Sequence, residues 1–147
     1  MIRWVRVTEA QLPAALDLRE ACMKEAAGRD ALPQDFRART EHYLRHGDQL
    51  TLLALDGNAC TGCATLCYMT VLPTADHPTG LRAHLMNVYT PPGFRRRGIA
   101  RTLVTALIDE ARQRGATEIS LDATAAGRPL YRALGFRDHG EGMTLHL

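Results

Sequence analysis

The strongest constraint on the fold of this chain is a helix pattern that directly follows an arginine-rich turn. Apolar residues recur every three or four positions between Gly98 and Gly115, namely Ile99, Ala100, Leu103, Val104, Leu107, Ile108 and Ala111. This spacing places them on one face of an amphipathic helix, and that face must be buried against another element. Residues 82 to 90 predict a strand before the turn, and residues 118 to 122 predict a second one after the helix. A strand, helix and strand in this order predict a parallel pair in one sheet.

The remaining segments complete a mixed α/β sheet. Asp56-Gly57-Asn58 is turn chemistry between two apolar runs, which is typical of a β-hairpin. The other expected elements are a strand over 2 to 7, helices over 8 to 28 and 33 to 46, the hairpin strands 50 to 55 and 59 to 71, a short helix over 129 to 134, and extended structure from Phe136 onward. We therefore expect one α/β domain over residues 1 to 147, with helices on both faces of a mixed sheet.

Composition argues against several classes of partner. Lys plus Arg is 18 and Asp plus Glu is 16, so the formal charge of +2 is too small to indicate a nucleic acid. The aromatic content of 5% also offers no platform for stacking bases. No run of about 18 apolar residues predicts a membrane span, and Met1 to Val7 lacks the apolar core of a signal peptide. We expect a cytoplasmic protein with reduced cysteines, and neither nucleic acid nor membrane as partner.

Two groups of residues have the types that bind metals, but their spacing does not favour a metal site. Cys60 and Cys63 should point to opposite faces of a strand, and Cys67 brings no fourth ligand. His42 and His46 share a helix face but have no third ligand nearby in the sequence. We predict that the cysteines pack in the core, that the histidines are solvated, and that no metal is bound.

The turn before the long helix has the properties of an anion site. The first N–H groups of a helix have no partner inside the helix and lie at the positive end of its dipole. Gly98 lets an anion approach the main chain, and Arg95, Arg96, Arg97 and Arg101 add positive charge. The segment matches neither the P-loop nor the dinucleotide-binding Gly-x-Gly-x-x-Gly motif. An isolated run of arginines could equally be a solvated turn, but its place before an amphipathic helix favours phosphate binding.

Two motifs resemble those of the GNAT superfamily of N-acetyltransferases. Residues 95 to 100, Arg-Arg-Arg-Gly-Ile-Ala, fit the pattern Arg/Gln-x-x-Gly-x-Gly/Ala that binds pyrophosphate in that family. Downstream, Leu130-Tyr131 followed by Gly135-Phe136 resembles the family's second signature. Both motifs stand in the family's order, and the expected elements match its topology over essentially the whole chain. The resemblance implies a mixed sheet that splays open to admit an acyl-CoA.

The resemblance also implies which residues hold acetyl-CoA. Asn87, Val88 and Tyr89 of the strand before the turn would line the pantetheine arm. The amides of residues 96 to 101 would hold the pyrophosphate, with Arg95 and the other arginines adding charge-assisted bonds. Thr124 stands where many relatives have an Asn that contacts the cofactor. The cofactor-binding residues expected are Asn87, Val88, Tyr89, Arg95, Arg96, Arg97, Gly98, Ile99, Ala100, Arg101, Thr124 and Tyr131.

Tyr131 matches the family's usual general acid, which protonates the departing CoA thiolate. A phenol with a pKa of about 10 can donate to a thiolate at neutral pH, so this role is chemically sound. An amide near Val88 would stabilise the oxyanion. Many relatives use a Glu of the central strand as base, but residues 82 to 90 contain none. His84, Asn87 acting through water, and Asp122 remain the candidates. Tyr131 has a plainer alternative role, packing against Phe136.

These observations predict direct transfer of an acetyl group from acetyl-CoA to a primary amine within one ternary complex. The acceptor is a small-molecule or peptide amine whose identity the sequence leaves open, as it does the choice between acetyl and a longer acyl donor. We also expect a homodimer. Two alternatives remain: a non-catalytic acyl-CoA sensor or assembly module with the same fold, and nucleic-acid binding by the arginine run.

Overall fold

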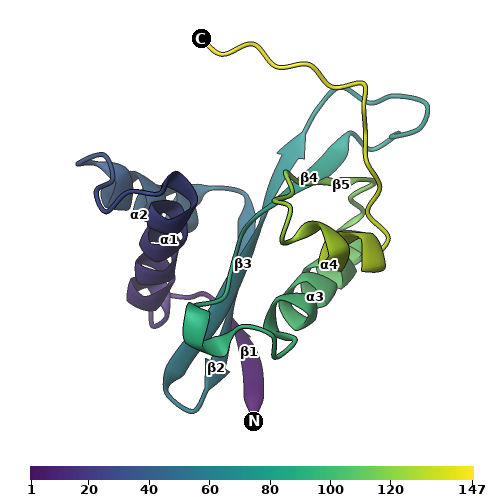
Figure 1. Ribbon diagram of the computed structural model, residues 1–147. Helices are drawn as coiled ribbons and strands as arrows, with labels where there is room; N and C mark the ends of the chain where they lie inside the picture. Colours follow the sequence, from purple (N-terminus) through teal and green to yellow (C-terminus); the bar gives the residue numbers. More distant parts are fainter.

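The structure, a computed structural model, describes residues 1 to 147 and has the predicted mixed α/β architecture (Figure 1). Five strands form one sheet in the order β1-β2-β3-β4-β5, in which only the β4–β5 pair is parallel. The elements are β1 (Ile2–Arg6), α1 (Leu12–Ala27), α2 (Phe36–His46), β2 (Gln49–Asp56), β3 (Ala59–Thr70), β4 (Leu81–Tyr89), the 3₁₀ helix η1 (Pro92–Phe94), α3 (Ile99–Arg114), β5 (Ile119–Ser120) and α4 (Arg128–Ala133). The hairpin and the parallel strand-helix-strand unit are confirmed.

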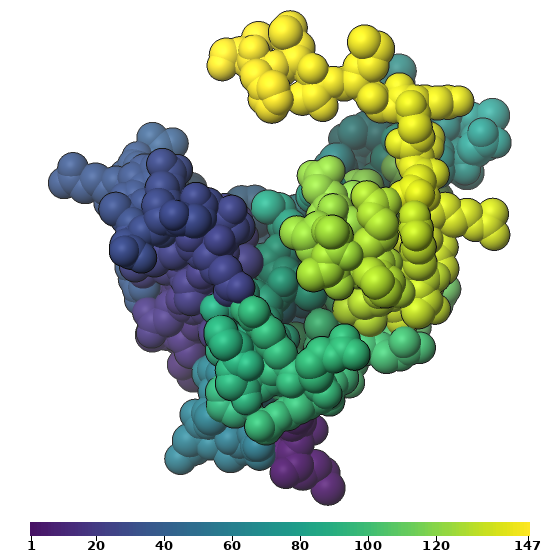
Figure 2. Space-filling model, in the orientation of Figure 1, coloured from purple at the N-terminus to yellow at the C-terminus, as the bar shows by residue number.

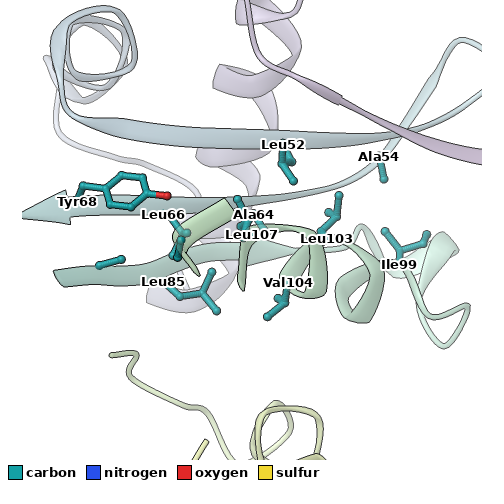
Figure 3. Close-up of a cluster of buried hydrophobic side chains, with 12 residues drawn as sticks. Leu52, Ala54, Ala64, Leu66, Tyr68, Leu85, Ile99, Leu103, Val104 and Leu107 are labelled. Carbon is teal, nitrogen blue, oxygen red and sulfur yellow. The ribbon is translucent and has the colours of Figure 1, made fainter. Parts of the chain in front are cut away.

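Helices cover both faces of the sheet, as predicted (Figure 1). Alternation along β2 sends Leu52 to one face and Leu53 to the other. The larger core lies under α3 and is shown in Figure 3; its members are Leu52, Ala54, Ala64, Leu66, Tyr68, Ala83, Leu85, Ile99, Leu103, Val104, Leu107 and Ala111. The smaller core lies under α1 and consists of Ala15, Leu18, Leu53 and Cys63. The helix face inferred from the apolar spacing of α3 is therefore the buried one.

The sheet opens where β4 meets β5. The two strands pair only at Ala83–Ile119 and His84–Ser120, and from there to Tyr89 β4 is paired with β3 alone. At Asn87 the backbone has a φ of 58°, and the register with β3 shifts between Cys63 and Thr65. Such a bulge bends the strand and interrupts the ladder. The outer edge of β4 therefore keeps main-chain groups with no strand partner, which is the splayed sheet that the resemblance implied.

The cysteines of β3 pack differently from the prediction. Cys60 and Cys63 were expected on opposite faces, and this was wrong: both pack against the small core under α1. The reason is a bulge in β3, where Ala54 of β2 pairs with Gly62 and Leu55 pairs with Cys60, leaving Thr61 as an extra residue.

No group of three His, Cys, Asp or Glu side chains could hold a metal ion. None of the helices combines the length and apolarity needed to span a bilayer.

Some predicted boundaries were also wrong. No strand follows Phe136; the chain instead runs away from the body as an unpaired tail (Figure 1). A strand forms only beside a neighbour to which it can hydrogen-bond. Because β5 is only two residues long, it offers too little backbone to pair with a further strand, so the extended pattern after Phe136 did not produce one. Helix α1 starts at Leu12 instead of Thr8, because the Thr8 N–H and hydroxyl both donate to the Gln11 side chain and close a separate turn. Helix α2 starts at Phe36, three residues after the expected Pro33.

Candidate functional site

The turn between β4 and α3 presents a row of backbone N–H groups. None of the amides from Arg96 to Arg101 donates to a backbone carbonyl, and the first such donor is Thr102, 3.0 Å from the Gly98 oxygen. No side chain caps the helix start. Arg96 and Gly98 both have a left-handed backbone, with φ of 64° and 77°. This winding and the helix dipole together give the turn the features of a main-chain anion site, namely a row of free amides at the positive end of a helix.

The arginines of this turn fall into two groups. The Arg95 Nη2 lies 2.7 Å from both carboxylate oxygens of Glu25 in α1, and its Nε donates to the Thr90 carbonyl at 2.8 Å. This contact lowers the pKa of Glu25. By contrast, Arg96, Arg97 and Arg101 form no ion pair. The net positive charge beside the free amides therefore comes from these three residues, while the charge of Arg95 is balanced by α1.

The bulge in β4 is held by polar contacts beneath it. The Cys63 thiol donates to the Asn87 carbonyl at 3.4 Å, and the Asn87 Nδ2 donates to the Thr65 hydroxyl at 3.2 Å. Thr65 lies 2.8 Å from the Thr51 hydroxyl, which donates to Gln49. Because the one Thr51 proton is used on Gln49, Thr65 must donate to Thr51, and this fixes the Asn87 amide orientation. The Asn87 Oδ1 is buried without a partner, so it is available to accept a hydrogen bond.

Tyr131 is carried by α4. The Thr124 hydroxyl accepts the Gly127 N–H at 3.1 Å and its carbonyl accepts the Arg128 N–H at 3.0 Å, so Thr124 stabilises the turn that starts this helix. The Tyr131 ring packs edge-on against Phe136, with centroids 5.8 Å apart. Burial raises the pKa of Tyr131, and no hydrogen bond within the protein engages its hydroxyl. Tyr131 therefore packs against Phe136 and also keeps a protonated hydroxyl that has no hydrogen-bond partner.

The candidate bases lie in two separate places. The His84 Nδ1 lies 2.8 Å from the Ser120 hydroxyl, and its Nε2 lies 3.8 Å from a carboxylate oxygen of Asp122. These residues gather where β4 and β5 begin to separate. Asn87 instead lines a different cavity, in which neither His84 nor Asp122 takes part. The structure therefore brings two of the three candidates together and leaves the third beside the bulge.

A cavity of about 540 Å³ lies between the α1–α2 pair and strands β3 and β4. The hollow that Figure 2 shows between α1, in dark blue, and α4, in yellow-green, is not this cavity, because no residue of α4 lines it. The residues lining the cavity are Arg19, Pro33, Asp35, Phe36, Arg39, Thr40, Tyr43, Leu44, Thr65, Cys67, Met86 and Asn87. Of these, only Asn87 was expected from the sequence. The helices supply most of the others and carry no motif, so only the fold could bring these side chains together.

Two curated proteins are similar to part of the chain. A glucosamine 6-phosphate N-acetyltransferase from Trypanosoma brucei brucei is 33% identical over 64 residues, which cover 44% of each chain. An alanine N-acetyltransferase acting on ribosomal protein bS18, from Salmonella typhimurium, is 41% identical over 59 residues, covering 38% of this chain and 40% of that protein. The matched part thus spans less than half the length of both relatives.

Whole-chain comparison adds the fold and the family. A predicted acetyltransferase from Clostridium acetobutylicum, solved with acetyl-CoA, superposes with a TM-score of 0.88 at 23% identity, over 99% of this chain and 96% of that one. At this identity the likeness shows the fold alone. The family model for the acetyltransferase (GNAT) family matches residues 12 to 136, which include both motifs and the splayed strands. The chain therefore belongs to the GNAT family of acetyltransferases.

Proposed function

We propose that this protein transfers the acetyl group of acetyl-CoA to a primary amine, by direct attack within a ternary complex. The observation that carries this proposal is the row of amides from Arg96 to Arg101, which lack internal acceptors beside the open edge of β4. Family membership and the named N-acetyltransferase relatives support the same reaction. A homodimer and a cytoplasmic location remain predictions.

The residues at the splay fit acetyl-CoA in charge and in hydrogen-bonding capacity. The amides of residues 96 to 101 would bind the pyrophosphate, with Arg96, Arg97 and Arg101 supplying positive charge. The unpaired edge of β4 at Val88 and Tyr89 would hydrogen-bond the pantetheine arm in the manner of an added strand. Arg95 would act mainly by holding the turn against α1 through Glu25. Thr124 would shape the site by starting α4.

The reaction joins the amine nitrogen to the acetyl carbonyl carbon and breaks the carbon–sulfur bond. The amine must lose a proton, and His84, Asn87 through water, and Asp122 remain the candidates for this step. An amide near Val88 would stabilise the negative oxygen of the tetrahedral intermediate. The Tyr131 phenol would give its proton to the leaving thiolate. Its raised pKa supports this role, because the hydroxyl stays protonated at neutral pH.

Thiol release during incubation with acetyl-CoA and a panel of primary amines tests the proposal. We expect release that depends on the amine and produces the acetylated amine, detected by mass spectrometry. A protein that binds acetyl-CoA but releases no thiol with any amine would instead be an acyl-CoA sensor. Measuring acetyl-CoA binding by calorimetry in the same preparation separates this outcome from a misfolded sample.

A further inference from the structure

The cavity between α1–α2 and the strands contains one cation that no acidic side chain neutralises. Its charged residues are Arg19, Arg39 and Asp35. Asp35 forms an ion pair with Arg39, so neither of these two is left with an unbalanced charge. Arg19 forms no ion pair, although it lies in a helix pair rich in acidic residues. The cavity therefore carries a net positive charge, located at Arg19.

The neighbouring arginines show that this lack of a partner is particular to Arg19. On α2, Arg37 pairs with both Asp17 and Glu20 of α1. Arg45 of the same helix is likewise paired, with Glu9 and Glu41. Together with Arg39, three arginines of α2 are thus neutralised by local carboxylates. The half-buried Arg19 of α1 instead lies over the Phe36 ring, with its guanidinium carbon 6.0 Å from the ring centroid. Stacking on an aromatic face leaves the edge of a guanidinium free for a planar anion.

Arg19 lines the same cavity as Asn87, the bulged residue of β4. Asn87 directly precedes Val88, whose amide is the proposed oxyanion donor. The cavity therefore joins Arg19 to the part of β4 at which acyl transfer would occur. An acceptor held in this cavity would place its anionic group at Arg19 and its amine toward the β4 bulge, so both groups must fit within one cavity.

The rest of the wall is largely apolar. Phe36, Leu44 and Met86 line it together with Pro33 and the ring of Tyr43. Such a surface favours an aliphatic or aromatic body, since burying apolar area is favourable and burying additional charge is not. We infer that the acceptor is a small primary amine that carries one carboxylate or phosphate group and an apolar body. This inference rests on the proposed acetyl transfer and narrows its substrate class; polycationic amines such as aminoglycosides would be poor acceptors.

Matched pairs of acceptors test the inference. Phenylalanine and phenethylamine differ by a carboxylate, and O-phosphotyramine and tyramine differ by a phosphate, while all four have an aromatic body. We expect kcat/KM to favour the anionic member of at least one pair by about tenfold or more, as a charge-assisted bond predicts. The pair that shows the larger ratio identifies carboxylate or phosphate as the preferred anion. Arg19→Gln should bring that ratio to near one, and Arg19→Lys should retain part of it.

Arg37→Gln is the matched control, because it removes the same charge from a residue that is already paired and lies outside the cavity. This variant should keep the ratio of the native protein. Acetyl-CoA affinity, measured for all three variants, checks that the fold and cofactor site are intact. If the amines without a carboxylate or phosphate were turned over at rates equal to or above those of their anion-bearing analogues, the inference would be overturned while acetyl transfer stayed intact. Absence of turnover with every amine would overturn the proposed function, and the inference with it.

Discussion

The Arg95 guanidinium and the Glu25 carboxylate form a two-pronged contact, with both Nη2–oxygen distances at 2.7 Å. The two residues are 70 positions apart, so this ion pair joins α1 to the turn that precedes α3. The ring of Tyr89 lies beside it, with the Arg95 guanidinium carbon 5.9 Å from the ring centroid. The contact thus links α1, which lines the proposed acceptor cavity with Arg19, to the loop that presents the free amides.

This pairing predicts an unequal contribution from the arginines to acetyl-CoA binding. Arg95→Gln should weaken acetyl-CoA binding by less than about threefold, because Glu25 already balances that charge. The double variant Arg96→Gln with Arg97→Gln should weaken it by more than about tenfold, since neither residue has an acidic partner. Isothermal calorimetry at low and moderate salt measures both. An Arg95→Gln defect as large as that of the double variant would mean that Arg95 leaves Glu25 to bind the phosphates.

Tyr131→Phe should lower kcat by about a hundredfold or more, which is the usual range for loss of a general acid. The affinity for acetyl-CoA should change little, because phenylalanine preserves the edge-on packing against Phe136. Steady-state kinetics combined with direct binding separate the two effects. An unchanged kcat in the variant would restrict Tyr131 to a packing role and require another proton donor.

Gly98→Ala should weaken acetyl-CoA binding. Gly98 has a φ of 77°, and forcing an alanine into this left-handed conformation costs about 1–2 kcal/mol. The turn would relieve that strain by moving the amides that we propose bind the phosphates. Gly93→Ala is the control, because Gly93 lies in the same loop without a positive φ and an added Cβ there meets no atom within 4 Å. Equal affinities of the two variants would show that the winding at Gly98 is not required.

Asp48 and Arg114 should give the fold a small pH dependence on the acid side. The two side chains meet at 2.6 Å and 2.7 Å, and the hydrogen bond from Arg114 lowers the pKa of Asp48. A lowered pKa means that this stabilisation is present above the unfolded value, about 3.9, and is lost as pH falls through the folded value. Because the Arg114 side chain is 43% exposed and that of Asp48 is 54% exposed, water screens the pair and limits its contribution to stability to about 1 kcal/mol or less.

Urea unfolding of the native protein and of Asp48→Asn, measured at pH 6 and near pH 3, checks this dependence. The difference in free energy of unfolding between the two proteins should shrink at the lower pH, because the unfolded carboxyl group takes up a proton there and the ionised form of Asp48 loses its advantage. A difference that stays constant across this range would assign the effect of the substitution to something other than the carboxylate charge.

Local sequence patterns were sufficient for the elements that set the fold. The apolar spacing from Ile99 to Ala111 identified the buried face of α3, and the turn chemistry at Gly57 identified the β2–β3 hairpin. The arginine turn and the Tyr131 segment identified the family that the comparison then confirmed. The helix and hairpin patterns depend on residues that are near one another in the chain. The anion site depends on main-chain N–H groups, which lack partners at the start of any helix.

Only the tertiary structure decided which distant side chains meet. The pairing of Arg95 with Glu25 and the lack of a partner for Arg19 depend on how α1 docks on the sheet, which no local pattern encodes. The bulge at Thr61 places Cys60 and Cys63 on the same face instead of on opposite faces, because one extra residue changes the parity of every side chain beyond it. The residues after Phe136 form no strand, although their sequence pattern predicted one. A strand forms only where a neighbouring strand accepts and donates its hydrogen bonds, and the tertiary structure decides whether that neighbour is present.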